Sequence, residues 1–312
     1  MPELIRLSEV CCDLGRGAQR RRVLEAVNLS LAEGECLGIV GESGSGKTTL
    51  GRILVGLQTI SAGVIRLRGD SVSDDAGRGT RPGQMQMVFQ DSARSLNPRH
   101  TVFDNLIEPL RLRGQTKTEC LAAAQHWIER VGLRQDHLSH YPRQLSGGQK
   151  QRVCIARAFI AGPELVVCDE AISALDVSVQ AQILHLLRQL QAETGVTMVF
   201  IAHDLPIVRA LTGRILVMYG GQVLESADGA VLFEAAAHPY TRDLIAATPG
   251  LDPARRRRDV RSDQLQKTVL SPANSGCVYR LRCDRVSDRC LQAPASEAVG
   301  PNHEVKCWHP LT

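Results

Sequence analysis

Apolar and polar residues alternate in two segments near the N-terminus, Leu4–Leu7 and Val27–Leu31. Alternation with a period of two predicts β-strands that bury one face, as in an antiparallel layer. A short unbroken apolar run, Cys36–Val40, follows and leads directly into a glycine. This run predicts a buried strand, with a helix beginning after it near Lys47.

From Thr101 to Leu133 the apolar residues recur at the spacing of a helix. They are Val102, Leu106, Leu110, Leu121, Trp127, Ile128 and Val131. We therefore expect an inserted helical subdomain at about residues 91–160. Beyond it, the apolar runs Leu165–Cys168 and Thr197–Ile201 flank a helical stretch from Val177 to Leu190. This order of strand, helix and strand predicts a parallel sheet, so the chain is expected to have an α/β fold with an antiparallel β subdomain.

The composition changes near Ala254, where Arg255–Arg258 form a basic run. Little apolar periodicity follows before a tail that carries cysteines at residues 277–307. We place a linker there, and expect a main domain over residues 1–253 and a weakly structured C-terminal extension over residues 254–312. Internal repeats of fixed period are not apparent, which argues against a repeat solenoid.

Composition narrows the class of protein. The chain has 312 residues, of which 43% are hydrophobic and 22% charged, as in a folded globular protein. The net charge is +4, which is too small for a broad nucleic-acid-binding surface, so we expect no nucleic acid partner. No apolar run reaches the roughly 18 residues of a membrane span, and no signal peptide pattern opens the chain. We therefore expect a cytoplasmic protein whose ten cysteines are reduced.

The glycines after the first buried strand form a candidate phosphate-binding loop. The motif G-x-x-x-x-G-K-[ST] matches Gly41, Glu42, Ser43, Gly44, Ser45, Gly46, Lys47 and Thr48, with Thr49 next in the helix. Backbone N–H groups of such a loop bind phosphate oxygens, the lysine neutralises the β- and γ-phosphates, and the Thr48 hydroxyl binds Mg²⁺. A glycine turn without a ligand is the alternative, and the flanking strand and helix argue against it.

Two carboxylates, Asp169 and Glu170, end the next apolar strand. The carboxyl ends of parallel strands are where α/β sheets hold ligands. Asp169 is expected to bind the nucleotide through Mg²⁺, and Glu170 to polarise an attacking water as the general base. Two acids after a strand form a solvated loop more often than a site, but their pairing with the phosphate loop favours hydrolysis.

The segment Leu145–Gln149 resembles the signature motif of the ABC ATPases, a family of P-loop NTPases with a RecA-like core. This resemblance implies that Ser146, Gly147, Gly148 and Gln149 bind the γ-phosphate of a nucleotide held by a second ATPase subunit. It further implies three sites in family order: Gln90 as the Q-loop glutamine and a Mg²⁺ ligand, His203 as the switch histidine, and Ser173–Asp176 as the D-loop. ATP would be held between two subunits, identical or related, and the catalytic group would comprise Glu170, His203 and Gln90.

Two positions depart from the family pattern. Leu14 stands where most ABC domains have an aromatic residue that stacks on adenine, so we expect weaker or less selective adenine binding. Ala171–Ile172 follows the catalytic glutamate where many relatives have Pro-Thr.

Further segments resemble the ATPases of oligopeptide, dipeptide and nickel importers. They are Phe89–Asp91, Ser95–Arg99, Glu108–Leu110 and His238–Leu244. The resemblance implies import of peptides or nickel, two transmembrane permease subunits and an extracytoplasmic solute-binding protein as partners, and a peripheral location on the cytoplasmic face of the inner membrane. It leaves the solute open, because specificity resides in the other chains. The alternatives are an exporter ATPase, or a soluble ABC ATPase that acts on nucleic acid or the translation machinery.

Four cysteines in the tail form a candidate metal site. Cys277, Cys283, Cys290 and Cys307 are separated by five, six and sixteen residues. Related importer ATPases carry a similar pattern, in some of them with a [4Fe-4S] cluster, which we favour over zinc because C-x-x-C pairs are lacking. Free thiols remain an alternative, and His303 or His309 could replace a ligand. The other cysteines, at 11, 12, 36, 120, 154 and 168, are expected to be packed in the core.

Overall fold

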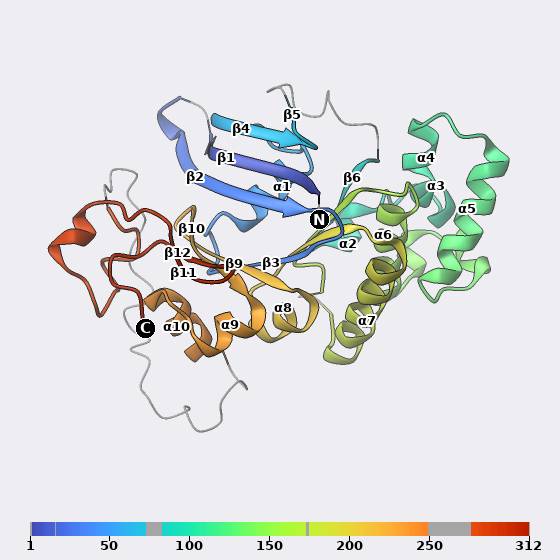
Figure 1. Cartoon of the computed structure of the whole chain (residues 1–312). Helices are drawn as coiled ribbons and strands as arrows, with labels where there is room; N and C mark the ends of the chain where they lie inside the picture. Colours follow the sequence, from blue (N-terminus) through green and yellow to red (C-terminus); the bar gives the residue numbers. More distant parts are fainter. Residues whose placement is uncertain (1, 16, 73–82, 173–174, 249–275, 312) are drawn as a thin grey trace.

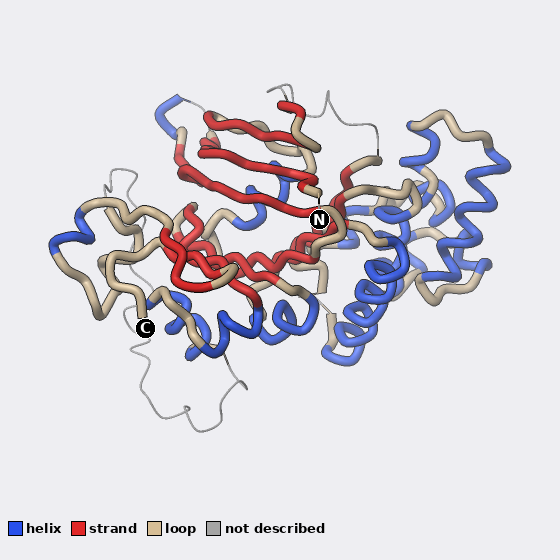
Figure 2. The backbone as a smooth tube through the Cα atoms, in the orientation of Figure 1, coloured by secondary structure: helices blue, strands red, loops and turns tan. Residues whose placement is uncertain are grey.

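Two β-sheets with helices packed beside them make up the chain in the computed structural model, which describes residues 2–15, 17–72, 83–172, 175–248 and 276–311. Figure 1 shows the elements in chain order, and Figure 2 separates helices from strands. The linker and the boundary expected near residue 254, with the basic run Arg255–Arg258, lie outside the described residues.

The smaller sheet is antiparallel and lies above the larger one in Figure 1. Its strands, in spatial order, are β2 (Arg21–Ala32), β1 (Glu3–Leu14), β4 (Ala62–Leu67) and β5 (Asp70–Ser71). In β1 the residues Ile5 and Leu7 are buried while Arg6 between them is exposed. The antiparallel layer predicted from alternation is thereby confirmed.

The larger sheet contains the parallel core. Its order is β11 (Glu297–Gly300), β12 (His303–Val305), β10 (Gln222–Asp228), β9 (Arg214–Tyr219), β3 (Cys36–Val40), β8 (Thr197–Ile201), β7 (Leu165–Asp169) and β6 (Met85–Val88). Neighbouring strands from β9 to β6 pair parallel, whereas β9, β10, β12 and β11 pair antiparallel. The predicted parallel-sheet core is confirmed, and β3 and β8 have the predicted bounds.

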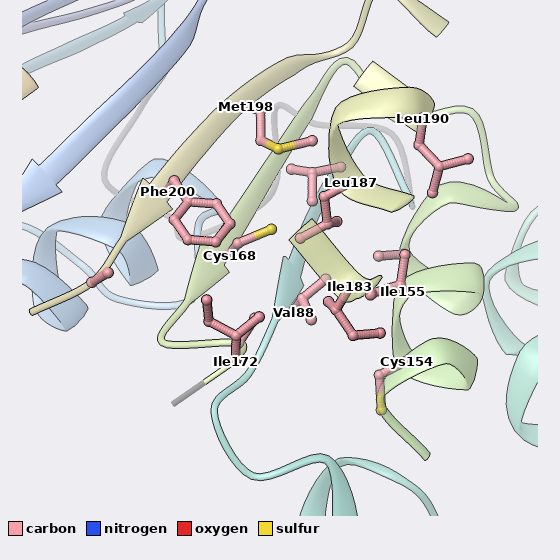
Figure 3. Close-up of a cluster of buried hydrophobic side chains, with 14 of the residues drawn as sticks. Val88, Cys154, Ile155, Cys168, Ile172, Ile183, Leu187, Leu190, Met198 and Phe200 are labelled. Atoms are coloured by element: carbon pink, nitrogen blue, oxygen red, sulfur yellow. The ribbon is translucent and has the colours of Figure 1, made fainter. Parts of the chain in front are cut away.

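Alternate residues of the parallel strands fill two separate cores. Val167 of β7 and Ile201 of β8 pack towards the antiparallel sheet. Cys168 and Phe200, their neighbours along the strands, pack with the helices on the opposite face. Figure 3 shows Cys168 and Phe200 with Ile183 among the buried side chains of this second core. Burial on both faces explains why these strands have unbroken apolar sequences.

Helices cover the second core and form a lobe at one end of the molecule, except for α1, which packs in the first core beneath the antiparallel sheet (Figure 1). They are α1 (Lys47–Leu54), α2 (Ser92–Ser95), α3 (Val102–Leu106), α4 (Glu108–Leu112), α5 (Lys117–Arg130), α6 (Gly147–Phe159), α7 (Val177–Thr194), α8 (Leu205–Leu211), α9 (Gly229–Glu234) and α10 (Pro239–Ala246). The lobe comprises α2 to α6, and α5 begins at a capping box in which Thr116 and Glu119 bond each other's backbone N–H. In the described ranges, none of the helices combines the length and apolarity needed to cross a bilayer.

The C-terminal extension differs from the expectation of a weakly structured tail. Its strands β11 and β12 add to the edge of the larger sheet, where Val305 pairs with Glu225 of β10. These strands are too short to produce a local pattern in the sequence, and they form because an edge strand offers free backbone groups.

A buried carboxylate fixes the extension to the sheet. The Glu225 side chain is fully buried. Its carboxylate accepts hydrogen bonds from the backbone N–H of Ala237 at 2.7 Å and from that of His238 at 2.8 Å. It also lies 2.7 Å from His303 Nε2, the third hydrogen-bond partner. His303, whose side chain is 6% exposed, lies in β12. Glu225 therefore joins β10, β12 and the start of α10.

We expect Glu225→Ala to lower the free energy of unfolding by about 3 kcal/mol, because three buried polar groups lose their acceptor. Urea unfolding of the full chain would measure the change. Glu304→Ala is the matched control, since Glu304 lies in β12, the strand that pairs with β10, but is exposed, and should change stability by less than about 0.5 kcal/mol. Equal effects of the two variants would contradict the role of Glu225.

Candidate active site

The phosphate loop leaves β3 and ends at the first residue of α1, Lys47, as predicted. Two of its glycines occupy positions that no side chain fits. A Cβ on Gly41, whose φ is +151°, would lie 2.1 Å from the carbonyl oxygen of Met218. A Cβ on Gly46, whose φ is +100°, would lie 2.6 Å from Leu24 Cδ2. The loop is therefore held closely between β2 and β9, with Ser43 and Gly44 exposed at its tip.

Lys47 is folded back on the loop. It is 6% exposed, and its Nζ donates to the carbonyl oxygens of Gly41 at 2.8 Å and Glu42 at 2.9 Å. Burial lowers the pKa of Lys47, although the carboxylates of Glu170, Asp169 and Glu42 oppose this shift. A buried ammonium beside three carboxylates provides the positive charge that a triphosphate needs.

Two of the three predicted magnesium ligands, Thr48 and Asp169, are hydrogen-bonded to each other. Thr48 Oγ1 donates to Asp169 Oδ1 at 3.0 Å. Asp169 ends β7 and is 6% exposed; burial raises its pKa, and the hydrogen bond from Thr48 opposes that shift. Mg²⁺ usually binds one or two protein oxygens together with phosphate oxygens and waters, so a hydroxyl and a carboxylate at this distance fit the ion.

Glu170, Gln90 and His203 converge from three separate segments. Gln90 Nε2 donates to Glu170 Oε2 at 2.9 Å, and His203 Nδ1 lies 3.7 Å from Glu170 Oε1. Glu170 itself has a φ of +46°, in the left-handed region, while its N–H donates to the carbonyl oxygen of Ile201 at 2.9 Å. A non-glycine residue held there costs about 1–3 kcal/mol, and such strain concentrates at functional sites.

Ser146 and Gln149 of the signature segment make hydrogen bonds within the helical lobe. Ser146 caps α6, and Ser146 and Gln149 bond each other's backbone N–H at 2.9 and 3.3 Å. Gln149 Nε2 also contacts His137 at 3.3 Å. Ser146 and Gly147 are exposed and Gly148 is half-buried, so the start of this helix is open to a second molecule. Ser173 and Ala174 of the predicted D-loop lie outside the described residues.

The two departures from the family pattern have different surroundings. Leu14 is the last residue of β1, is half-buried and packs against the core beneath the antiparallel sheet. Ile172 is 3% exposed and belongs to the second core (Figure 3). Ile172 therefore contributes to packing of the second core.

The four cysteines of the extension lie close to one another. Burial raises the pKa of Cys307 to about 11, and the nearby thiols of Cys277, Cys283 and Cys290 act in the same direction. Burial likewise raises the pKa of Cys283 and of Cys277, and each is also influenced by Cys290. Within the described ranges, no three His, Cys, Asp or Glu side chains are arranged to hold a metal ion, so the thiols are neighbours that do not close on the position of a single ion.

Other candidate ligands have different roles. His303 bonds Glu225, and His309 Nε2 lies 2.6 Å from the hydroxyl of Ser287. The remaining cysteines are buried, apart from the half-buried Cys36. Burial raises the pKa of Cys36 to about 12, and the packing interpretation of these residues is confirmed.

Sequence reasoning missed the residues that surround Glu42. Tyr240 accepts a hydrogen bond from the Glu42 N–H at 2.9 Å, and Arg282 forms an ion pair with its carboxylate at 2.9 Å. The segment His238–Leu244 was singled out only by resemblance, and nothing in its spacing indicated contact with a loop about 200 residues earlier.

Comparisons with known proteins identify relatives over most of the chain. A family model described as ABC transporter matches residues 24–173, and one described as oligopeptide/dipeptide transporter, C-terminal region, matches residues 224–290. A putative peptide import ATP-binding protein of Brucella ovis is 43% identical, over 92% of this chain and 91% of the relative. A putative oligopeptide transport ATP-binding protein of Bacillus subtilis is 39% identical, over 97% of this chain and 94% of the relative.

Solved structures agree with the fold. An ATP-binding cassette solved as a dimer in a post-hydrolysis state with ADP and Pi is similar, with a TM-score of 0.64 and 30% identity, over 72% of this chain and 98% of that chain. A component of an ABC transporter complex from Clostridium perfringens has a TM-score of 0.66 at 24% identity, over 75% of this chain and 92% of that chain, which supports the fold alone.

We expect Glu170→Gln to retain ATP binding and to lower the turnover number at least about 100-fold, because the amide keeps the shape but cannot take a proton. Phosphate release and nucleotide titration would measure the two effects separately. Glu297→Gln, the same change at an exposed residue of β11, is the control and should leave both unchanged. Undiminished turnover in the Glu170 variant would remove it from the catalytic group.

Proposed function

The chain belongs to the ABC transporter family of ATP-binding proteins, and from that premise we propose that it hydrolyses ATP to drive the import of peptides. The observation that carries this proposal is the match of residues 224–290 to the C-terminal region of oligopeptide/dipeptide transporters. The names of relatives at 39% and 43% identity support the same class of solute.

Catalysis is proposed to use the groups gathered at the ends of β3, β7 and β8. Lys47 and the loop N–H groups bind the β- and γ-phosphates, and Thr48, Asp169 and Gln90 hold Mg²⁺, which neutralises phosphate charge. Glu170 accepts the proton of the attacking water, and His203, 3.7 Å from the Glu170 carboxylate, is placed to contact the γ-phosphate. The hydrogen bond of Gln90 to Glu170 supports the orientation of the base.

A second ATPase subunit completes the site in this proposal. The segment Ser146, Gly147, Gly148 and Gln149 binds the γ-phosphate in the partner subunit, because Ser146 and Gly147 are exposed at the start of their helix. A similar cassette is known as a dimer with ADP and Pi. The pair then drives two transmembrane permease subunits that receive the solute from an extracytoplasmic binding protein, which places this chain at the cytoplasmic face of the membrane.

The extension is proposed to hold a [4Fe-4S] cluster through Cys277, Cys283, Cys290 and Cys307. Backbone N–H groups of Arg285 and His309 point at the sulfurs of Cys283 and Cys307, both at 3.4 Å. N–H donors to cysteine sulfur are characteristic of iron–sulfur sites, and four cysteines supply the number of ligands that a [4Fe-4S] cluster needs.

The import of peptides is tested with the complex of this chain, its permease subunits and its binding protein in liposomes. We expect a peptide-loaded binding protein to stimulate ATP hydrolysis, while the Glu170→Gln complex shows no stimulated turnover. Stimulation by nickel in place of peptides would contradict the solute class. If no permease subunit copurifies and nucleic acid stimulates turnover, the importer proposal is wrong and the ATPase assignment alone survives.

The cluster is tested by anaerobic purification of the full chain. We expect about four irons per chain and broad visible absorbance, both lost in Cys283→Ser without abolition of ATP binding. Cys36→Ser is the control and should keep the iron, because Cys36 lies at the start of β3, outside the extension. A colourless, iron-free wild-type protein would contradict the cluster.

A further inference from the structure

Arg282 of the C-terminal extension contacts the phosphate loop. Its Nη1 donates to Glu42 Oε2 at 2.9 Å and its Nη2 donates to Glu42 Oε1 at 3.0 Å. Two parallel N–H···O bonds between a guanidinium and a carboxylate are the strong, directional form of an ion pair. The contact therefore links the extension directly to the second residue of the phosphate loop.

Glu42 is fixed through all of its polar groups. Arg282 binds its carboxylate, Tyr240 Oη accepts from its backbone N–H at 2.9 Å, and Lys47 donates to its carbonyl oxygen at 2.9 Å. Lys47 is the proposed phosphate-binding cation, so Glu42 connects the extension to that ammonium group. A shift of Glu42 would move one of the carbonyl oxygens that accept a hydrogen bond from Lys47.

The guanidinium of Arg282 is itself held in place. It lies over the rings of Tyr219 and Tyr279, at 5.6 and 5.5 Å from their centroids. The side chain is 18% exposed, and Nη1 also donates to Tyr219 Oη at 3.3 Å. An arginine packed between aromatic rings loses little further entropy when it binds a carboxylate, so the pair is preorganised.

The segment His238–Leu244 supplies the second support of Glu42. Tyr240 is 1% exposed, and its N–H donates to His238 Nδ1 at 3.0 Å. The N–H of His238 donates in turn to the buried Glu225. Asp243 accepts from Tyr279 Oη at 2.6 Å, so this segment is joined to the extension as well.

We propose that Arg282 is a positioning residue for ATP binding, which neutralises the Glu42 carboxylate and holds the first turn of the phosphate loop for the triphosphate. Without Arg282, Glu42 would be an uncompensated negative charge at the anion-binding loop, where it repels the phosphates. This inference depends on ATP binding by the family and is independent of the imported solute and of the iron–sulfur cluster.

The test is a double-mutant cycle on the full chain, read as the dissociation constant of Mg-ATP by calorimetry and as turnover at saturating ATP. We expect Arg282→Gln to weaken ATP binding about tenfold, with turnover at saturation changed by less than about twofold. In a Glu42→Gln background, Arg282→Gln should have no further effect on binding, because the charge that it compensates is gone. Such coupling is a result that a general loss of stability would not produce.

Two further variants complete the design. Arg282→Lys keeps the charge but loses the paired bonds, and should weaken binding by about threefold; it also serves if the glutamine variant fails to fold. Arg285→Gln is the control in the same extension, since Arg285 Nη1 bonds the Pro310 carbonyl oxygen, and should bind ATP as the wild type does. Unchanged ATP affinity in both Arg282 variants would overturn the proposal. The proposal would also be overturned if Arg282→Gln weakened ATP binding equally in the wild-type and Glu42→Gln backgrounds.

Discussion

Strands β3, β8 and β7 pair parallel and in register, so the segments that follow them leave the sheet at one edge. Residue Ile39 of β3 lies opposite Ile201 of β8, which lies opposite Asp169 of β7. The phosphate loop, His203 and the carboxylates Asp169 and Glu170 are therefore neighbours because of backbone pairing, before any side-chain interaction is considered. The two apolar cores on either face stabilise this pairing, and the rest of the site depends on it.

The extension takes part in the same structural unit. It adds β12 to the sheet, it contributes His303 to the buried Glu225 site, and it places Arg282 on Glu42. These contacts lie on the side of the loop opposite to the helical lobe (Figure 1). The phosphate loop is consequently contacted by the extension on one side, while Glu170, the proposed general base, is contacted by Gln90, which precedes the helical lobe.

The features that the sequence predicted are formed by residues close together in the chain, whereas the features that it did not predict join residues far apart in the chain. Short apolar runs such as Thr197–Ile201 are fully buried, so their local composition specifies both element and bounds. The contact of Arg282 with Glu42 joins residues separated by 240 positions, and the short strands of the extension form only against β10. No local pattern encodes such pairs. The proximity of the four tail cysteines was expected from chemistry and resemblance, and spacing alone did not determine it.

Glu170 has a strained backbone conformation, and its carboxylate is contacted by Gln90 and His203. Its φ lies in the left-handed region, and its N–H donates to the carbonyl oxygen of Ile201 in the neighbouring strand β8. Gln90 lies between the end of β6 at Val88 and the start of α2 at Ser92. Since Gln90 bonds Glu170 and directly precedes the helical lobe, a displacement of that lobe would alter the environment of Glu170, the proposed general base. A movement imposed on the lobe by another subunit could thus change the rate of hydrolysis without touching the nucleotide.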